Sequence, residues 1–124
     1  MYQAAEALAA EVERLLPEAT RAGASQADHL ERSADSVLFN MAEGIGAFQP
    51  KVKTNAYGIA RREASELRAV LRRLEIKRVF TRAEIDKAYN LAGVCLAMLT
   101  RAIITIERSD RSPRDNKQIG RTED

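Results

Sequence analysis

Apolar residues recur every three or four positions along most of the chain, a spacing that matches the turn of an α-helix. The pattern predicts four amphipathic helices, over residues 2–16, 26–43, 54–77 and 82–108. No run alternates β-branched and polar residues, so no strand is predicted. Long helices with short connections predict an all-α fold, an antiparallel up-down four-helix bundle spanning residues 1–108. Residues 109–124 are almost free of apolar side chains and are expected to form a disordered polar tail.

Residues with special backbone or capping preferences mark the expected helix ends. Pro17 ends or kinks the first helix, because proline cannot donate the intrahelical hydrogen bond. Ser25 followed by Asp28 resembles a capping pair at the start of the second helix. Gly44 and Gly46 are expected to stop that helix.

The fourth helix has the clearest start and the widest apolar face. Its first residues, Thr81-Arg82-Ala83-Glu84, read as a capping box. Apolar residues then cover about half of the helix circumference. They are Ile85, Ala88, Tyr89, Leu91, Ala92, Cys95, Leu96, Met98, Leu99, Ala102, Ile103 and Ile106. This width favours packing on two sides, by the bundle and by a neighbouring subunit; the alternative is a long central helix in a monomer.

The second helix carries a polar stripe beside its apolar arc. The arc consists of Leu30, Ala34, Val37, Met41 and Ile45, and the stripe of His29, Ser33, Ser36, Asn40 and Glu43. No base, metal cluster or nucleophile elsewhere completes a catalytic site, so we interpret the stripe as a buried polar network. Asn40 and Glu43 are expected to bond across to the third helix, where Arg61 and Glu63 are the nearest candidates. Phe39 lies away from the arc, as a surface aromatic or a contact between subunits.

Composition and the isolated reactive residues argue against an enzyme. The 124 residues, 45% apolar and 5% aromatic, suffice for one helical domain. His29 is the only histidine and Cys95 the only cysteine, so no catalytic residue, metal site or cofactor is predicted. No basic leader is present, and the longest uncharged run, residues 88–100, is too short to span a bilayer. A soluble cytoplasmic protein is therefore expected.

Positive charge is concentrated in one segment of the chain. The net charge is +2, but residues 47–80 hold nine basic and three acidic residues. Three arginines there share a narrow sector of the third helix, which predicts weak RNA or DNA binding through phosphates. The candidate binding residues are Lys51, Lys53, Arg61, Arg68 and Arg72. The alternative is a solvated face with internal ion pairs, favoured by the interspersed acids and by the lack of an aromatic partner.

Residues 32–44 resemble the signature of the small four-helix bundle proteins first found in intervening sequences of 23S ribosomal RNA genes. The stretch reads Arg-Ser-Ala-Asp-Ser-Val-Leu-Phe-Asn-Met-Ala-Glu-Gly, and a second, weaker block aligns with residues 60–67. The motif positions are Ser33, Ser36, Asn40, Glu43 and Gly44. Where the family has Gly-Ser, this chain has Arg62-Glu63. Glu63 falls in the apolar sector of its helix, where a carboxylate needs a partner.

The resemblance spans most of residues 4–106 and implies a ring-shaped homopentamer. It also implies a relation to the accessory proteins of diversity-generating retroelements, which look like nucleic-acid binders through a basic surface. No catalytic residue carries over. We therefore expect a non-enzymatic homopentamer that binds RNA or DNA weakly, with no membrane and no small-molecule partner. The alternative is a protein–protein interaction scaffold that binds no nucleic acid.

Overall fold

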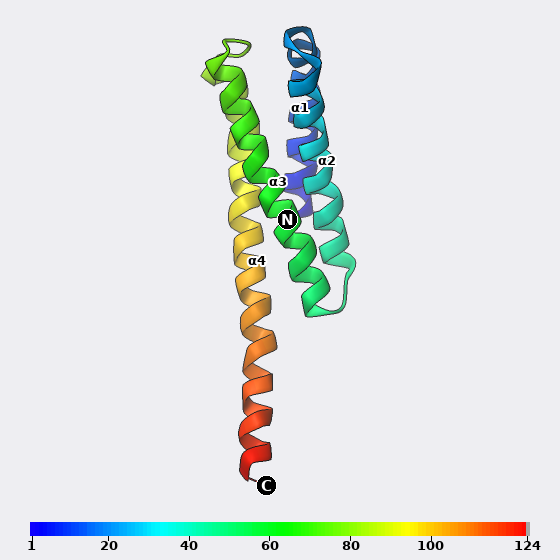
Figure 1. Ribbon diagram of the computed structural model, residues 1–124, viewed down its shortest axis with the longest axis vertical. Coiled ribbons are helices and arrows are strands. Elements are labelled where there is room, and N and C mark those ends of the chain that lie inside the picture. The colour runs from blue at the N-terminus through cyan, green and yellow to red at the C-terminus, as the bar shows by residue number, and fades with distance from the viewer. Residues whose placement is uncertain (124) are drawn as a thin grey trace.

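The computed structural model describes the backbone of residues 1–123 and the side chains of residues 1–110. Four helices follow one another along the chain: α1 (Tyr2–Ala22), α2 (Ala24–Gly46), α3 (Pro50–Ile76) and α4 (Arg82–Glu123). Consecutive helices pack side by side in alternating directions, and α1 also contacts α4 (Figure 1). The predicted all-α up-down bundle is confirmed. The predicted disordered tail falls almost wholly outside the described side chains, and it stays a prediction.

The core is built from the apolar faces that the sequence predicts. The apolar residues that share one face of α3 by helical spacing are all buried: Tyr57, Ala60, Ala64, Leu67, Val70, Leu71 and Leu74. On α2 the apolar arc is buried as far as Met41, but Ile45 is about half exposed, which corrects the prediction. Ile45 lies in the last turn of α2, beside the α2–α3 turn, and α1 stops short of that turn (Figure 1). Phe80, in the turn before α4, closes the other end of the core.

The first two helices are almost continuous. α1 runs through Pro17 to Ala22, beyond its predicted end. Pro17 and Glu13 are both exposed, so water can bond the Glu13 carbonyl that the missing proline N–H leaves free. Gly23 alone separates α1 from α2, in place of a longer connection.

Local chemistry explains the other helix starts. Ser25 lies inside the first turn of α2, where no side chain caps the helix, so the predicted Ser25–Asp28 cap is wrong. α3 begins at Pro50, because proline is well suited to the first helical turn, where its missing N–H costs nothing. The capping box before α4 is confirmed. The Glu84 N–H donates to Thr81 Oγ1 at 3.2 Å, and the Thr81 N–H donates to Glu84 Oε1 at 2.8 Å.

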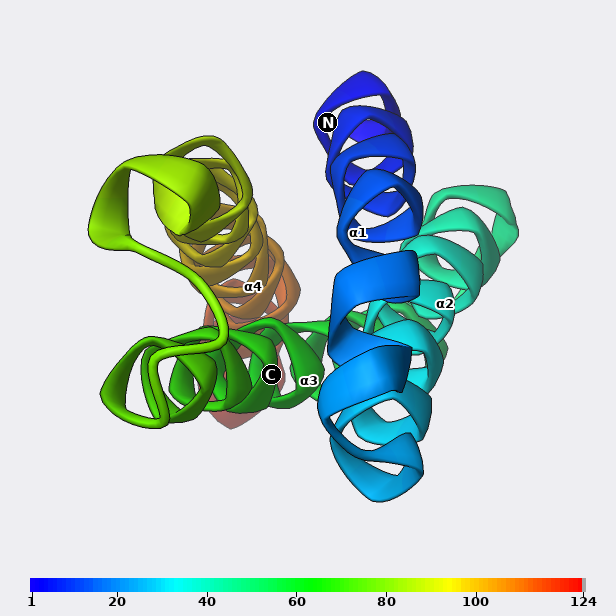
Figure 2. The ribbon, with the colours of Figure 1, turned by 90° about the horizontal axis from the view of Figure 1, so that it is seen from above.

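One cluster of charges ties α1 to α4. Seen from above, α1 lies beside α2 and diverges from α4 (Figure 2). The nearly buried Glu11 carboxylate bridges this pair of helices, 2.8 Å from Arg14 Nη2 and 3.4 Å from Lys87 Nζ. The hydrogen bond from Arg14, helped by Lys87, lowers the pKa of Glu11 despite the opposing effect of burial.

We expect Glu11→Gln to lower the free energy of unfolding by about 1 kcal/mol at neutral pH. The pKa of Glu11 in the folded protein lies below its usual 4.5, so its contribution is complete above that value. The contribution is lost as the pH falls through the folded-state pKa. Urea unfolding at neutral and acidic pH should therefore show a difference that shrinks in acid. Glu13→Gln, at an exposed position of the same helix, is the control and should change little at either pH.

Candidate nucleic-acid interface

The predicted arginines of α3 lie along the line where α3 meets α4. The α3–α4 arginine seam consists of Arg61, Arg68 and Arg72 from α3 and Arg82 from α4. At one end, Arg61 Nε donates a 2.7 Å hydrogen bond to Thr100 Oγ1 on α4. The arginines are therefore not a free outer ridge, because their side chains also connect the two helices.

Tyr89 of α4 lies beneath the middle of the seam. The Arg68 guanidinium is 4.0 Å from the centre of the Tyr89 ring, and the Arg72 guanidinium is 5.0 Å from it. Both distances allow cation–π attraction. The expectation that no aromatic accompanies the arginines is therefore wrong. Tyr89 lies at the edge of the apolar arc of α4, and helical spacing alone does not show that this edge meets the arginines.

Glu75 neutralises part of the positive charge of the seam. Its two carboxylate oxygens accept from Arg72 Nη1 at 3.2 Å and from Arg82 Nε at 3.1 Å. Arg61 and Arg68 have no carboxylate partner within residues 1–110. The neighbouring Arg72 guanidinium, with the charges of Arg68 and Arg82, lowers the pKa of Tyr89. The seam is thus a net-positive surface around one tyrosine, and such a surface suits contacts with phosphate oxygens.

The two predicted lysines lie apart from the seam's ion pairs. Lys51 is exposed in the first turn of α3. Lys53 Nζ donates to the carbonyls of Gly44 at 2.8 Å and Ile45 at 3.3 Å. A cation at these carbonyls stabilises the negative end of α2, so Lys53 has a structural task in the α2–α3 turn.

The polar stripe of α2 does not form the expected network with α3. Asn40 Nδ2 donates within its own helix, to the Ser36 carbonyl at 2.9 Å and to Ser36 Oγ at 3.1 Å. Glu43 is exposed, and Arg61 bonds to α4 instead. Ser33 Oγ is buried and has no hydrogen-bond partner among residues 1–110. The prediction of hydrogen bonds from Asn40 across to α3 is therefore wrong, because the Asn40 amide bonds to Ser36 of its own helix and Glu43 faces the solvent.

Gly44 of the same motif has a steric role. A Cβ atom at this position would lie 2.3 Å from Cε1 and 2.6 Å from Cδ1 of Tyr57. Gly44 is inside α2, so it does not stop the helix as predicted. It leaves room for the Tyr57 ring of α3 to pack directly against the α2 backbone.

The isolated reactive residues have ordinary surroundings. His29 Nε2 lies 3.7 Å from Glu66 Oε2, and both side chains are exposed. Burial raises the pKa of the Cys95 thiol. Glu63 is half-buried, so it is not enclosed among apolar side chains as its position on the helix predicted. Within residues 1–110, no three His, Cys, Asp or Glu side chains gather to hold a metal ion.

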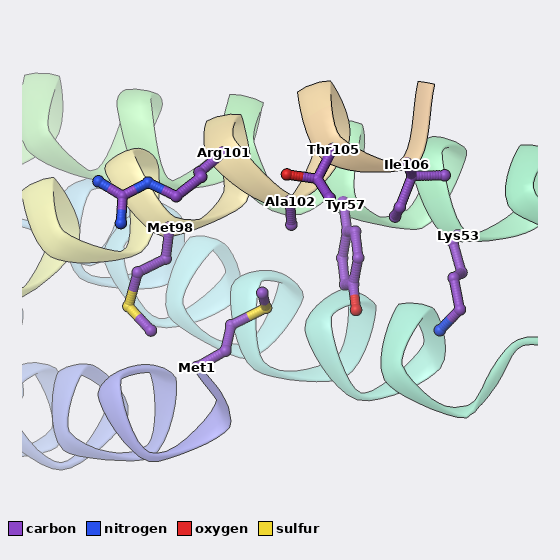
Figure 3. A pocket seen from close by; sticks show the side chains of 8 residues that line it. All are labelled: Met1, Lys53, Tyr57, Met98, Arg101, Ala102, Thr105 and Ile106. Carbon is purple, nitrogen blue, oxygen red and sulfur yellow. The ribbon is translucent and has the colours of Figure 1, made fainter. Parts of the chain in front are cut away.

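A groove of about 500 Å³ lies beyond the N-terminal end of α1, between α3 and α4 (Figure 3). We call it the α1-end groove. Figure 3 shows α1 ending at Met1, before it reaches the level of Tyr57 and Lys53. Its apolar lining comes from Met1, Tyr57, Met98, Ala102 and Ile106, and its polar lining from Lys53, Arg101 and Thr105.

Comparison with known proteins identifies the family. The model of the 23S rRNA-intervening sequence protein family matches residues 1–101 of the 124-residue chain. The match includes α1, α2, α3 and the part of α4 that carries Tyr89 and Thr100. A search of the curated proteins and a search of the solved structures each found no match.

Proposed function

The chain belongs to the 23S rRNA-intervening sequence protein family, and we propose that it is a non-enzymatic, cytoplasmic homopentamer that binds RNA or DNA weakly. In this proposal the exposed apolar face of α4 forms part of the contact between subunits, and the α3–α4 arginine seam contacts phosphates. The observation that carries the proposal is that one small subunit has both an apolar face of α4 that is only partly buried and a net-positive arginine seam.

The uncovered surface of α4 supports assembly. Only part of its wide apolar arc is buried in a single subunit; the half-exposed members are Tyr89, Leu91, Leu96, Met98, Ala102, Ile103 and Ile106. Val94 and Ile104, outside the arc, are also exposed. Apolar surface left open on this scale favours association, because association removes it from water.

A second copy fits this surface better than a lipid bilayer does. An 18-residue window of α4 within Arg82–Asp110 has a mean hydropathy of 1.5, and 17% of it is buried. Length and composition alone would allow such a helix to cross a membrane. Arg101, however, lies on the same face as the exposed Val94 and Ile104, and a charged side chain facing lipid is unfavourable. A protein partner can leave Arg101 in water while covering its apolar neighbours.

The unequal pairing of the seam supports weak binding of nucleic acid. Glu75 neutralises part of the charge on Arg72 and Arg82, whereas Arg61 and Arg68 keep theirs. The seam of a single subunit therefore offers few unpaired cations, and affinity would come from repeating the seam around a ring. Because the contacts are with phosphates, binding would depend strongly on salt and little on sequence.

We expect fluorescence anisotropy to detect binding of single-stranded RNA or DNA at ~50 mM salt, with affinity falling as salt rises. Arg61→Gln should weaken binding and reduce the slope of log affinity against log salt by about one. Arg32→Gln, at an exposed position of α2, keeps the change in net charge but lies outside the seam and should have a smaller effect. Absence of binding at low salt would contradict the proposal. Capture of a protein partner that survives nuclease treatment would then favour an interaction scaffold.

A further inference from the structure

The α2–α3 turn carries a cluster of apolar side chains that a single subunit leaves in water. We call it the apolar knob: Ile45, Phe48 and Val52. Ile45 and Val52 are exposed by 47% and 42%, and Phe48 by 98%. In a single subunit Phe48 contributes almost no buried apolar surface, whereas a large aromatic side chain in a small protein is usually at least partly buried.

The α1-end groove is an apolar hollow at the same end of the bundle. Its volume, about 500 Å³, has room for an aromatic side chain with part of its neighbours. The groove lies beyond the N-terminal end of α1, which does not reach the α2–α3 turn (Figure 1). Since Phe48 is almost wholly exposed, it does not fill the groove of its own subunit.

We propose that the apolar knob of one subunit occupies the α1-end groove of the next, with Phe48 as the central contact. This inference rests on the proposed homo-oligomer and specifies how its subunits meet. The knob and the groove are different patches, so the contact is head-to-tail, and it closes into a ring when the rotation between subunits is suitable. A ring with an odd number of subunits requires such a contact, because two identical patches facing each other pair subunits two by two.

The heights of the two patches along the bundle fit a ring. Subunits of a closed ring are related by rotation alone, so a contact between neighbours must join patches at the same level along the ring axis. Val52 of the knob and Tyr57 of the groove are five residues apart on α3, about 7.5 Å by helical rise. With subunits roughly parallel to the axis, a small tilt brings the two patches to one level.

The chemistry of the two surfaces also matches. The knob contains no charged side chain, and the groove offers it Met1, Met98 and Ala102. The cations of the groove lining, Lys53 and Arg101, have aliphatic stems that can cover apolar surface while their charges stay in water. Methionine side chains adapt their shape to an inserted ring, and sulfur–aromatic contacts are favourable.

The test measures the mass of the full chain by light scattering after size-exclusion chromatography at micromolar concentration. Wild type should be oligomeric. Phe48→Asp should be monomeric with unchanged helix content, since Phe48 makes almost no contact within its own subunit. Ile76→Asp is the matched control, because Ile76 is 70% exposed at the opposite end of α3 and should leave the oligomer intact. Thr105→Arg, at an exposed position of the groove lining, should also give a monomer.

Mixing the two disrupted variants gives a sharper result. Phe48→Asp keeps an intact groove, and Thr105→Arg keeps an intact knob. An equimolar mixture should therefore form a heterodimer with one working contact and no larger ring. A mixture that stays monomeric, or one that restores the full oligomer, would overturn the proposed contact.

The outcomes separate this inference from the proposed function. A monomeric wild type would overturn the homo-oligomer, and the contact would fall with it. An oligomeric wild type whose mass is unchanged by Phe48→Asp, or equally disrupted by Ile76→Asp, would overturn the knob-and-groove contact alone.

Discussion

Replacing Gly44 with alanine is expected to lower the free energy of unfolding by about 1–2 kcal/mol. The new Cβ atom would lie 2.3 Å from Cε1 of Tyr57, closer than two carbon atoms can approach without a shift. The obstacle is a side chain with a relative exposure of 5%, and three atoms of its ring lie within 3.0 Å of the new Cβ atom, so the ring or the α2 backbone must shift. Alanine is more favourable than glycine in a helix by up to about 1 kcal/mol. The expected loss in the free energy of unfolding is therefore the steric cost reduced by this gain.

Gly58→Ala supplies the matched control for this prediction. Gly58 lies in the interior of α3, and a Cβ atom there meets nothing within 4 Å. This substitution should raise stability by about 0.5–1 kcal/mol, from helix propensity and from the smaller freedom of the unfolded chain. Urea unfolding of the two variants should thus give changes of opposite sign.

A double-mutant cycle tests whether the Tyr57 ring is the cause. In a Tyr57→Leu background the ring that meets position 44 is absent. Gly44→Ala should therefore lower the free energy of unfolding by less than it does in wild type. Equal costs in the two backgrounds would show that Gly44 is required for another reason, such as the end of α2.

Replacing Ser33 with alanine is expected to raise the free energy of unfolding by about 1 kcal/mol. Ser33 is 1% exposed, and its hydroxyl has no hydrogen-bond partner among the described residues. An unpaired buried hydroxyl costs free energy because it gives up its bonds to water on folding, and alanine removes that cost. Alanine is also the better helix former within α2.

Ser36→Ala is the comparison for Ser33→Ala. Ser36 is half-buried, and its hydroxyl accepts a 3.1 Å hydrogen bond from Asn40 Nδ2, so its loss should be neutral or mildly destabilising. If Ser33→Ala were the more damaging of the two, the Ser33 hydroxyl would have a partner such as a buried water. That outcome would restore the polar-network interpretation of the α2 stripe at this position.

The helices and their buried faces could be predicted from the sequence because both depend on local periodicity. Spacing of three and four residues identified the inward residues of α3, and the capping box at Thr81–Glu84 relies on contacts within one turn. Helix ends were less predictable. The sequence contains the proline at position 17, but whether it stops α1 depends on the solvent around the freed carbonyl.

The candidate interface was also only partly predictable from the sequence. The cluster of arginines on α3 follows from the helical wheel, and they do gather along one line. Their partners do not follow from it. Tyr89 and Thr100 come from α4, and they meet Arg68 and Arg61 only because α3 and α4 pack at a particular rotation and offset. Side-chain hydrogen bonds depend on such offsets within a few tenths of an ångström, which no single-helix pattern encodes.

The sequence by itself determined that this chain forms four amphipathic helices, that their apolar faces make one core, and that positive charge concentrates on α3. The signature over residues 32–44 also pointed to the family that the full comparison identified. Only the tertiary structure decided what the motif does: Gly44 makes room for Tyr57, and Asn40 bonds within its own helix. It also decided which side chains of α3 and α4 come together to line the α1-end groove. The physical reason is that periodicity fixes the direction of a side chain around its own helix axis, whereas the distance and height of the neighbouring helix are set by packing.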